Sequence, residues 1–312
     1  MRILVLGAGG TGGYFGGRLA QSGAEVTFLV RPARAAQLEE HGLQIRSPLG
    51  DADIPVAHVL AEELVALANE KPFDLVLLSC KAYDLDSSLD AIAPAMGQQT
   101  TLLPILNGLL HFEQLDARFG RERVLGGLCF ISATKGPSGE ILHLARPASI
   151  NFGERDGDPD SARVQAFAAL CAQAGVEHLA SADIHQQLWI KYSFLTALAA
   201  ATCLMRASVG EIVASAGGTQ FLTGVYAECV AVAGAAGQPI PPEKQAFALD
   251  TLTRHASPVK ASMLRDLEAG QRVEAAHIVG DMLQRAHRAG IAAPLLGAAW
   301  CHLQAYEASL AR

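Results

Sequence analysis

The chain has 312 residues, of which 50% are hydrophobic and 18% are charged, and this balance excludes a mainly disordered protein. A formal net charge of −7 excludes broad nucleic-acid binding, which needs a basic face to neutralise phosphates. The length exceeds what one hydrophobic core usually organises, so two domains are expected.

The first third of the chain alternates strand and helix signals. Buried strands are predicted at residues 3–6, 25–30, 75–79, 101–106 and 124–131. A glycine-rich turn and a helix to about residue 22 join the first two strands, which is the pattern of a βαβ unit in a mostly parallel sheet. Residues 140–153 alternate more loosely and contain Pro147, so we expect antiparallel strands that close the edge of this sheet.

The pattern changes after residue 180. A helix at 162–175 and a short strand at 176–180 complete a predicted Rossmann-type domain over residues 1–180. From residue 182 onward only helical spacing is found, with breaks at glycines and prolines, and this predicts an all-helical domain over 181–312. The predicted fold class is α/β, a doubly wound mostly parallel sheet plus an all-α C-terminal domain.

Cysteines, histidines and apolar stretches give no sign of a metal site or a membrane segment. The six cysteines are scattered without a C-x-x-C pair and predict reduced, buried thiols, and the ten histidines show no ligand spacing. The apolar stretch 194–205 is shorter than the roughly 20 residues that cross a bilayer. Because the N-terminus opens directly into a strand without a cleavable signal, we expect a soluble, cytoplasmic protein.

A dinucleotide-binding motif follows the first strand. The six residues are Gly7, Ala8, Gly9, Gly10, Thr11 and Gly12, which match G-x-G-x-x-G between a strand and a helix. Gly7 allows the tight turn, Gly9 lets the backbone approach a pyrophosphate, and Gly12 permits close helix-to-strand packing. The alternative is a glycine-rich turn without a ligand, which the βαβ context disfavours.

The end of the second strand indicates which dinucleotide is bound. An acidic residue there would bind the ribose 2′-hydroxyl of NAD, but this strand ends on Arg31. A guanidinium suits a 2′-phosphate, which favours NADP(H), with Arg34 as a second contact. The alternative is that Arg31 is a solvated surface residue.

Motifs spread along nearly the whole chain resemble the ketopantoate reductase (2-dehydropantoate 2-reductase) family. They are the opening GAGGTGGYFGGRLA, Ser79-Cys80-Lys81-Ala82, Leu106-Asn107-Gly108, Leu188-Trp189-Ile190-Lys191, Ser262-Met263-Leu264-Arg265-Asp266-Leu267, and Arg272-Val273-Glu274 before a helix that ends in GIAAP.

The resemblance implies a role for each matching residue. Lys191 would be the general acid, Asn107 would lie between nicotinamide, substrate and that lysine, and Lys81 would help to bind the cofactor. Ser262 would receive the substrate carboxylate, and Glu274 would contact the lysine or a substrate hydroxyl. Without the resemblance, Lys191 is interpreted as a solvated helix lysine and Asn107 as part of an Asn-Gly turn. Ser262 is then a helix cap and Glu274 a solvated first-turn acid.

Ser262 and Glu274 could not share a substrate on one straight helix, because twelve residues span about 18 Å. Gly270 lies between them and is a good helix-ending residue, so a break there is predicted. Both side chains can then return to one cleft.

The chain departs from the family on the helix that carries Lys191. The family has asparagines four and eight residues after the lysine, where this chain has Leu195 and Ala199. These positions share one helix face, so both residues are expected to line the substrate site and to make it less polar.

Three functions are consistent with these residues. The first is NADPH-dependent reduction of a 2-oxo acid to a 2-hydroxy acid, by family default ketopantoate to pantoate in pantothenate biosynthesis. The second is a related dehydrogenase that acts on a more apolar 2-oxo, 2-hydroxy or imino acid. The third is a non-catalytic NADP-binding sensor or scaffold. The combination of Lys191, Asn107, Ser262 and Glu274 disfavours it, because a sensor has no need for an acid catalyst. The alanine-rich C-terminal helices suit either a homodimer interface or core packing.

Overall fold

The structure is a computed structural model that describes residues 1–310. The chain forms two compact units. The N-terminal unit comprises Met1–Leu106 and His111–Ile184, and the helical unit comprises Asn107–Leu110 and His185–Arg312. A four-residue segment from the first third of the sequence therefore belongs with the C-terminal helices.

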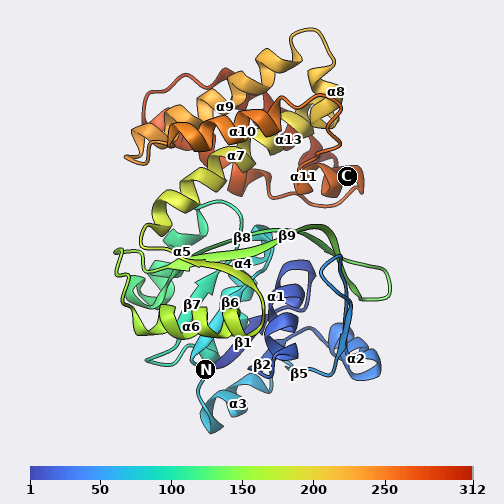
Figure 1. The fold of residues 1–312 in the computed structure, drawn as a ribbon, viewed down its shortest axis with the longest axis vertical. Helices are drawn as coiled ribbons and strands as arrows, with labels where there is room; N and C mark the ends of the chain where they lie inside the picture. The colour runs from blue at the N-terminus through green and yellow to red at the C-terminus, as the bar shows by residue number, and fades with distance from the viewer. Residues whose placement is uncertain (311–312) are drawn as a thin grey trace. The chain divides into compact units, whose positions relative to one another are not determined.

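A five-stranded parallel sheet is the centre of the N-terminal unit (Figure 1). Its strands are β1 (Arg2–Leu6), β2 (Glu25–Leu29), β5 (Ala57–Val59), β6 (Leu75–Leu78) and β7 (Thr101–Pro104). They lie in the order β5-β2-β1-β6-β7, which is the doubly wound arrangement, so the predicted fold class is confirmed.

A second sheet corrects the prediction for residues 124–131 and 140–153. Its strands are β3 (Leu43–Arg46), β4 (Ala52–Ile54), β8 (Gly126–Lys135), β9 (Ile141–Gly153) and β10 (Glu177–Ala180). The strand predicted for the parallel sheet at 124–131 is β8, which pairs antiparallel with β9 in this second sheet. A short turn joins β8 to β9, and two strands joined by a short turn pair with each other.

Helix α1 (Gly10–Gln21) contacts strands of both sheets. A Cβ on Gly13 would lie 2.9 Å from Ile141 Cδ1 of the second sheet, and one on Gly16 would lie 2.9 Å from the Phe28 ring of the first. The glycines of α1 thus allow the helix to pack closely against two sheets at once. The remaining helices of the unit are α2 (Pro32–His41), α3 (Leu64–Glu70), α4 (Leu85–Ile92), α5 (His111–Phe119) and α6 (Ala162–Gln173).

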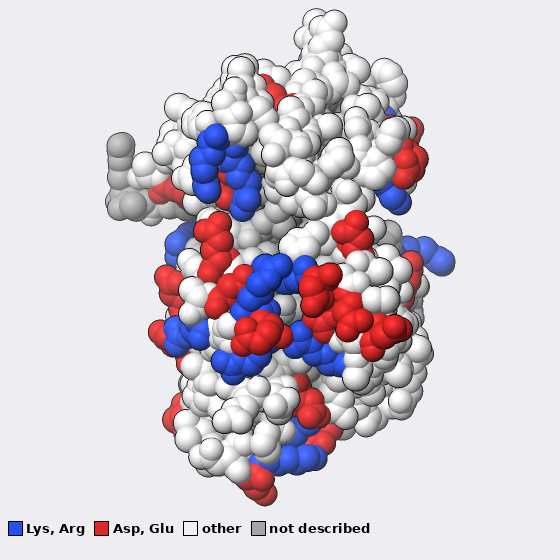
Figure 2. All heavy atoms as spheres, turned by 90° about the vertical axis from the view of Figure 1, so that its left-hand side faces the viewer, with Lys and Arg blue, Asp and Glu red and all other residues white. Residues whose placement is uncertain are grey.

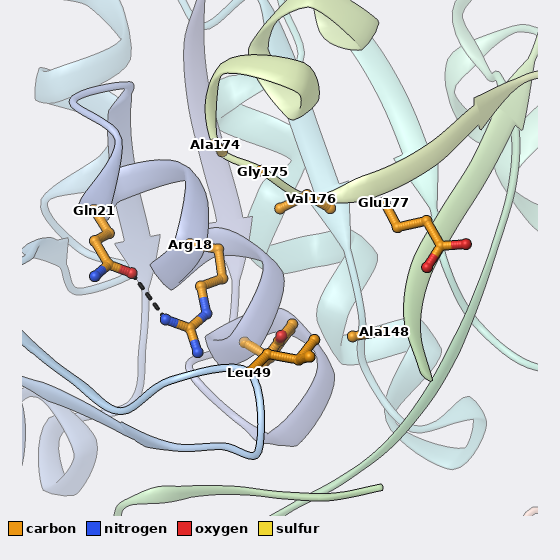
Figure 3. Close-up of a pocket in the computed structure, with 9 residues that line it drawn as sticks. Arg18, Gln21, Leu49, Ala148, Ala174, Gly175, Val176 and Glu177 are labelled. Atoms are coloured by element: carbon orange, nitrogen blue, oxygen red, sulfur yellow. Dashed lines mark hydrogen bonds between the residues drawn. The ribbon is translucent and has the colours of Figure 1, made fainter. Parts of the chain in front are cut away.

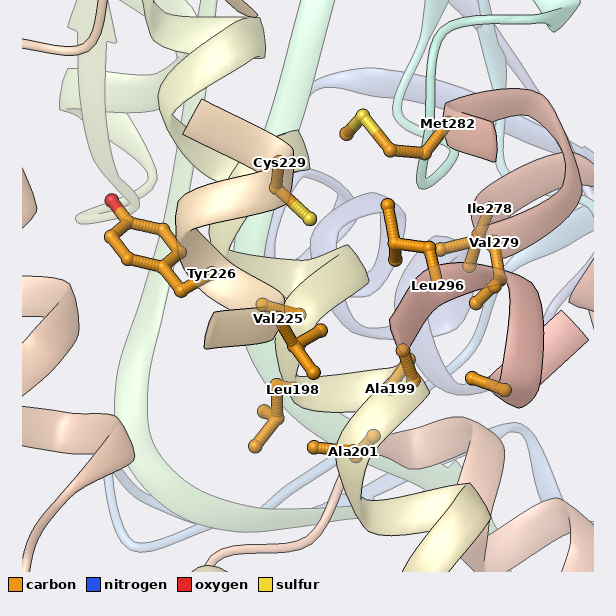
Figure 4. Close-up of a cluster of buried hydrophobic side chains, with 14 of the residues drawn as sticks. Leu198, Ala199, Ala201, Val225, Tyr226, Cys229, Ile278, Val279, Met282 and Leu296 are labelled. Atoms are coloured by element: carbon orange, nitrogen blue, oxygen red, sulfur yellow. The ribbon is translucent and has the colours of Figure 1, made fainter. Parts of the chain in front are cut away.

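The helical unit has its own buried core, part of which Figure 4 shows. Its elements are α7 (Ile184–Met205), α8 (Val209–Val213), α9 (Gly218–Ala235), α10 (Pro242–Leu252), α11 (Ser262–Glu268), the π-helical segment η4 (Ala276–Gly280), α12 (Asp281–Arg288) and α13 (Pro294–Leu310). In the described part of the chain no strand follows Ala180, which confirms the all-helical prediction. Gly217 and Gly290, at two of the predicted breaks, both have positive φ.

Helix α7 is longer than its apolar stretch 194–205. It has 22 residues and a mean hydropathy of 1.4 over its most apolar window, so length and composition alone would allow it to cross a membrane. The expectation that the stretch is too short is therefore wrong for the helix as a whole. Because 67% of that window is buried inside the protein, α7 has the character of a core helix.

All six cysteines are thiols rather than disulfide partners. Four of them are buried, and burial raises the pKa of both Cys171 and Cys203 to about 12. The expectation of buried thiols does not hold for Cys80, which is half-buried, or for Cys301, which is exposed.

Candidate functional site

The glycine motif forms the turn between β1 and α1, where the sequence predicts it. Gly7 has φ +82° and donates its N–H to the Leu29 carbonyl at 2.8 Å, which ties the turn to β2. A Cβ on Gly12 would overlap Ser79 Oγ and lie 2.7 Å from the Gly7 carbonyl oxygen. Glycine is therefore needed at both positions for steric reasons internal to the protein.

The open side of this turn fits a pyrophosphate. A Cβ on Gly9 would meet no protein atom within 4 Å, so the backbone at Gly9 faces free space. Gly9 is also the N-cap of α1, and the first turn of that helix carries no acidic residue. The free N–H groups and the helix dipole can thus bind an anion without a competing carboxylate.

Arg31 lies at the end of β2 as the N-cap residue of α2. Its side chain is 82% exposed, and Nη2 lies 3.6 Å from Asp84 Oδ2. Asp84 thus places a carboxylate beside the arginine that the sequence assigns to the 2′-phosphate. A bound 2′-phosphate would have to compete with this exposed ion pair, which is weak in water.

Arg34 is in direct contact with the glycine turn. Its Nε donates to the Ala8 carbonyl oxygen at 3.1 Å, and its Nη1 donates to Gln37 Oε1 at 3.1 Å. Its buried Nη2 has no hydrogen-bond partner among the described residues. Burial lowers the pKa of Arg34. Because this guanidinium contacts the glycine motif itself, Arg34 becomes a primary candidate for binding the cofactor and not only a second contact after Arg31.

The segment after β6 lies beside the glycine turn. Ser79 Oγ donates to the Leu6 carbonyl at 3.2 Å, so this segment is attached to the end of β1. Lys81 follows two residues later, is half-buried and precedes a 3-10 turn over Ala82–Asp84. Its place at the carboxyl end of the sheet is where ligands of such sheets bind.

Lys191 and Asn107 are in direct contact. Lys191, on α7, donates from Nζ to Asn107 Oδ1 at 2.9 Å. An ammonium group can only donate, so the amide oxygen is the atom that accepts, and the Asn107 NH2 group is left to donate elsewhere. The structure therefore brings together an acid and a hydrogen-bond donor from segments far apart in the sequence.

Gly108, the next residue, has φ +83° and packs on the π-helical segment η4. A Cβ on Gly108 would lie 2.9 Å from His277 Cδ2 and 3.0 Å from the His277 carbonyl oxygen. His277 was not singled out from the sequence, because a lone histidine in a helix carries no motif. It is buried, and burial lowers its pKa although the charges of Glu274 and Asp281 oppose that shift.

Glu274 and Ser262 lie on either side of the predicted break. Gly270 has φ +67°, α11 ends at Glu268, and helical backbone resumes at Ala275, directly after Glu274. Glu274 is 7% exposed. Ser262 is half-buried and is the first residue of α11, whose N-cap is Ala261, so Ser262 is not a capping residue.

The two positions that depart from the family have different surroundings. Leu195 is half-buried and lies one helical turn after Lys191. Ala199 is 0% exposed and belongs to the hydrophobic core, as Figure 4 shows. The expectation that Ala199 lines a pocket is therefore wrong in this structure, because α7 has entered the core by its second turn after Lys191. Leu195 is left as the candidate specificity residue.

A cavity of about 290 Å³ lies in the N-terminal unit (Figure 3). Tyr14, Arg18 and Gln21 contribute one face of α1 to it, and the rest of its lining includes Leu49, Ala148 and the segment 174–177. Gln21 is the last residue of α1, and the helix rises roughly 16 Å from Gly10 to that point. This cavity is thus at the opposite end of α1 from the glycine turn and is not part of the dinucleotide site.

The surface carries both acidic and basic side chains, in agreement with the formal net charge of −7. On the face in Figure 2, acidic and basic side chains are interspersed, and no broad basic patch is seen among the described residues of that face. In the N-terminal unit Arg155 pairs with Asp116 and Arg163 pairs with Glu154.

Comparisons with known proteins match both units. Residues 3–157 match the family model described as ketopantoate reductase PanE/ApbA, and residues 183–307 match the model of its C-terminal domain. An uncharacterized oxidoreductase of Bacillus subtilis (strain 168), YkpB, is 37% identical over 99% of both chains. A 2-dehydropantoate 2-reductase of Mesorhizobium japonicum is 28% identical over 88% of both.

Two solved structures have the same fold. The crystal structure of a 2-dehydropantoate 2-reductase from Geobacter metallireducens GS-15 aligns with a TM-score of 0.87 at 30% identity, over 97% of this chain and 99% of that one. A ternary structure of a D-mandelate dehydrogenase with NADH and anilino(oxo)acetate aligns over the full length of both chains with a TM-score of 0.87. Its identity is 24%, so this second likeness is one of fold alone.

Proposed function

Because this chain belongs to the ketopantoate reductase family and is an oxidoreductase, we propose that it reduces a 2-oxo acid to the 2-hydroxy acid with NADPH. The observation that carries this proposal is the 2.9 Å contact between Lys191 Nζ and Asn107 Oδ1. A proton donor held by an amide is what carbonyl reduction requires, whereas a binding protein or sensor has no use for it.

Residues of the helical unit can supply the proton that the carbonyl oxygen needs and can stabilise the negative charge that develops on that oxygen. The nicotinamide cofactor supplies a hydride to the carbonyl carbon when bound. Lys191 donates a proton from Nζ to the carbonyl oxygen, and its charge stabilises the oxyanion as it develops. Asn107 holds the ammonium through Oδ1 and can donate from its NH2 group to the substrate. The neutral amine then regains its proton from water.

Two further residues are proposed to hold the substrate. Ser262 is half-buried, and its hydroxyl is not used as a helix cap, so it is free to donate to the substrate carboxylate. Glu274 is largely buried just before the π-helical segment, where a carboxylate can accept from a substrate hydroxyl or from Lys191.

The cofactor is proposed to be NADP(H), bound with its pyrophosphate on the glycine turn and Lys81 beside it. The open side of Gly9 and the absence of an acid in the first turn of α1 support this placement. Arg31 and Arg34 are the cations near the end of β2, and both suit a 2′-phosphate. Arg34 is the better held of the two, because it is hydrogen-bonded to Ala8 and Gln37, whereas Arg31 is exposed and paired with Asp84.

The substrate is proposed to be a 2-oxo acid with an apolar side chain. Leu195 stands one turn after Lys191, so an apolar group lies beside the proton donor. Ketopantoate, on which relatives act by name, carries a hydroxyl that an apolar neighbour cannot bind. The D-mandelate dehydrogenase of the same fold acts, by name, on a compound whose 2-oxo form is phenylglyoxylate, and that acid represents the apolar class.

The deciding experiment is NADPH oxidation by the purified protein with ketopantoate and with phenylglyoxylate, alongside the Lys191→Met variant. Loss of the proton donor is expected to lower kcat by about 10² to 10⁴, with the Kd for NADPH unchanged. Faster turnover of phenylglyoxylate would support the apolar substrate class, and faster turnover of ketopantoate would return the chain to the family default. NADPH binding without reduction of any 2-oxo acid would refute the reductase proposal and favour the sensor.

A further inference from the structure

A buried polar cluster joins α7 to α12 directly beside Lys191. Tyr192 is 1% exposed, and its hydroxyl donates to Asp281 Oδ2 at 2.8 Å. Arg285 Nε donates to the same oxygen at 2.8 Å. The Asp281 side chain is 0% exposed, so the Arg285 guanidinium balances its charge inside the protein and the Tyr192 hydroxyl adds a hydrogen bond.

The same cluster has an aromatic side. The Arg285 guanidinium lies 5.6 Å from the centroid of the Trp189 ring, and the Trp189 and Tyr192 rings are 5.8 Å apart. Trp189 and Tyr192 are three residues apart and therefore share a face of α7. Lys191 lies between them in the sequence, so the cluster fixes the rotation of α7 about its axis and with it the direction of Lys191.

Asp281 is also continuous with the segment that packs on Gly108, the residue after Asn107. The π-helical segment η4 leads directly into α12, whose first residue is Asp281. Within η4, His277 packs on Gly108, the neighbour of Asn107. Tyr192 Oη lies 3.0 Å from the Ile278 carbonyl oxygen of the same segment. π-Helical turns are rare and are frequent at functional sites.

One helical stretch thus contacts the sequence neighbours of both members of the Lys191–Asn107 pair, Tyr192 and Gly108. It supports the Asn107 turn through His277 and helix α7 through Asp281. Its first residues also follow Glu274, whose carbonyl accepts from Ile278 N at 3.1 Å. A change in the packing of this stretch would change the distance between the proposed catalytic groups.

We propose that Asp281, with Tyr192 and Arg285, is a positioning residue that sets the direction of Lys191 and keeps its ammonium group against Asn107. This inference rests on the proposed role of Lys191 as the proton donor. It adds a requirement that lies outside the substrate site, since the Asp281 side chain is fully buried.

The test is Tyr192→Phe, which removes one oxygen from the cluster and keeps the ring. A catalytic group that is misplaced by about 1 Å costs on the order of 10² in rate, so we expect kcat to fall about 10- to 100-fold. KM for the 2-oxo acid and the Kd for NADPH should stay within about twofold, because the Tyr192 and Asp281 side chains are buried. Asp281→Asn should act in the same direction, and the double variant should be no slower than the slower single variant.

Tyr226→Phe is the matched control. Tyr226 is another buried tyrosine of the helical core, on α9, and its loss of a hydroxyl leaves Asp281 and Arg285 unchanged. Competitive acetylation followed by mass spectrometry reports the pKa of Lys191 without any turnover. We expect this pKa to shift in Tyr192→Phe and Asp281→Asn and not in Tyr226→Phe, which a loss of stability alone would not produce.

The outcomes separate this inference from the function on which it rests. Normal kcat and an unshifted Lys191 pKa in Tyr192→Phe would overturn the inference, while loss of activity in Lys191→Met would leave the function standing. Full activity in Lys191→Met would overturn both. A shifted Lys191 pKa in a protein that binds NADPH but reduces no 2-oxo acid of a broad panel would support the positioning role and refute the reductase proposal.

Discussion

The two candidate sites of this molecule are built from different parts of the chain. The glycine turn consists of consecutive backbone groups whose geometry follows from missing side chains at Gly7, Gly9 and Gly12. The pair of Lys191 and Asn107 depends on side chains from separate segments, held by the packing of several helices. A site made of backbone groups tolerates side-chain substitutions around it but loses its ligand when a Cβ is added. A site made of side chains loses its geometry when the residues that pack against those side chains move.

The sharpest test of the backbone site is a pair of alanine substitutions. Gly9→Ala places a methyl group in free space, so the protein should fold normally but lose close approach to the pyrophosphate, raising the Kd for NADPH about 10- to 100-fold. Gly12→Ala meets Ser79 and the Gly7 carbonyl, so it should lower the free energy of unfolding by about 1–3 kcal/mol. Fluorescence titration with NADPH and thermal unfolding measure the two effects. Equal Tm losses in both variants would contradict the distinction.

The departures from the family can be tested one at a time. Ala199→Asn buries an amide in the core without a partner and should destabilise the protein by about 2 kcal/mol or more. Leu195→Asn is half-buried, so the protein should stay folded. It should raise kcat/KM for ketopantoate relative to phenylglyoxylate about tenfold, because a new amide can bind the substrate hydroxyl.

Urea unfolding and steady-state kinetics on both acids check these two variants. A stable Ala199→Asn protein would show that this position has room that the structure does not indicate. An unchanged preference in Leu195→Asn would remove Leu195 as a specificity residue.

The two arginines near β2 should differ in cofactor binding. Replacing either with Gln should raise the Kd for NADPH about 3- to 10-fold and leave the Kd for NADH nearly unchanged, since only NADPH carries the 2′-phosphate. The larger effect is expected for Arg34, which is anchored on the Ala8 carbonyl, and the smaller for Arg31, which is exposed and paired with Asp84. Equal losses of affinity for NADH and NADPH would show that neither arginine binds the 2′-phosphate.

The smallest expected effect is on the pH dependence of stability. Burial lowers the pKa of His277 below its usual value of 6.5, with Glu274 and Asp281 opposing and Arg285 reinforcing the shift. The unfolded chain then binds the proton more readily, so this group makes the free energy of unfolding fall as the pH drops below about 6.5. His277→Gln should flatten this dependence in urea titrations at pH 5 to 7.5. An unaltered slope would assign the dependence to other groups.

Local geometry explains why the glycine turn could be predicted in advance. The turn, the helix after it and the strand before it occupy adjacent residues, and their spacing alone specifies the conformation. The same reasoning predicted four of the five strands of the parallel sheet, missing only β5, and it predicted the helical C-terminal unit correctly. It failed for β8 and β9, because an apolar run shows that a strand is buried and not which sheet contains it.

Tertiary contacts were beyond the reach of spacing. The family resemblance named both Lys191 and Asn107, and the structure supplied their contact. The proximity of Asp84 to Arg31 and of His277 to Gly108 depends on how distant segments pack, and no local pattern records it. The prediction for Ala199 was wrong for a related reason, since sharing a helix face with Lys191 does not reveal where the helix becomes buried.

The segment Asn107–Leu110 belongs to the helical unit although its flanking residues belong to the other. An exchange of C-terminal halves between relatives would therefore separate Lys191 from the amide that holds it, because that amide is encoded far upstream in the gene. A working chimera must bring Asn107 and Gly108 together with a matching His277, or its recombined halves will fold without a functional acid. A single crossover between Gly108 and Lys191 thus divides the catalytic pair, whereas one upstream of Asn107 keeps Asn107, Gly108, Lys191 and His277 together.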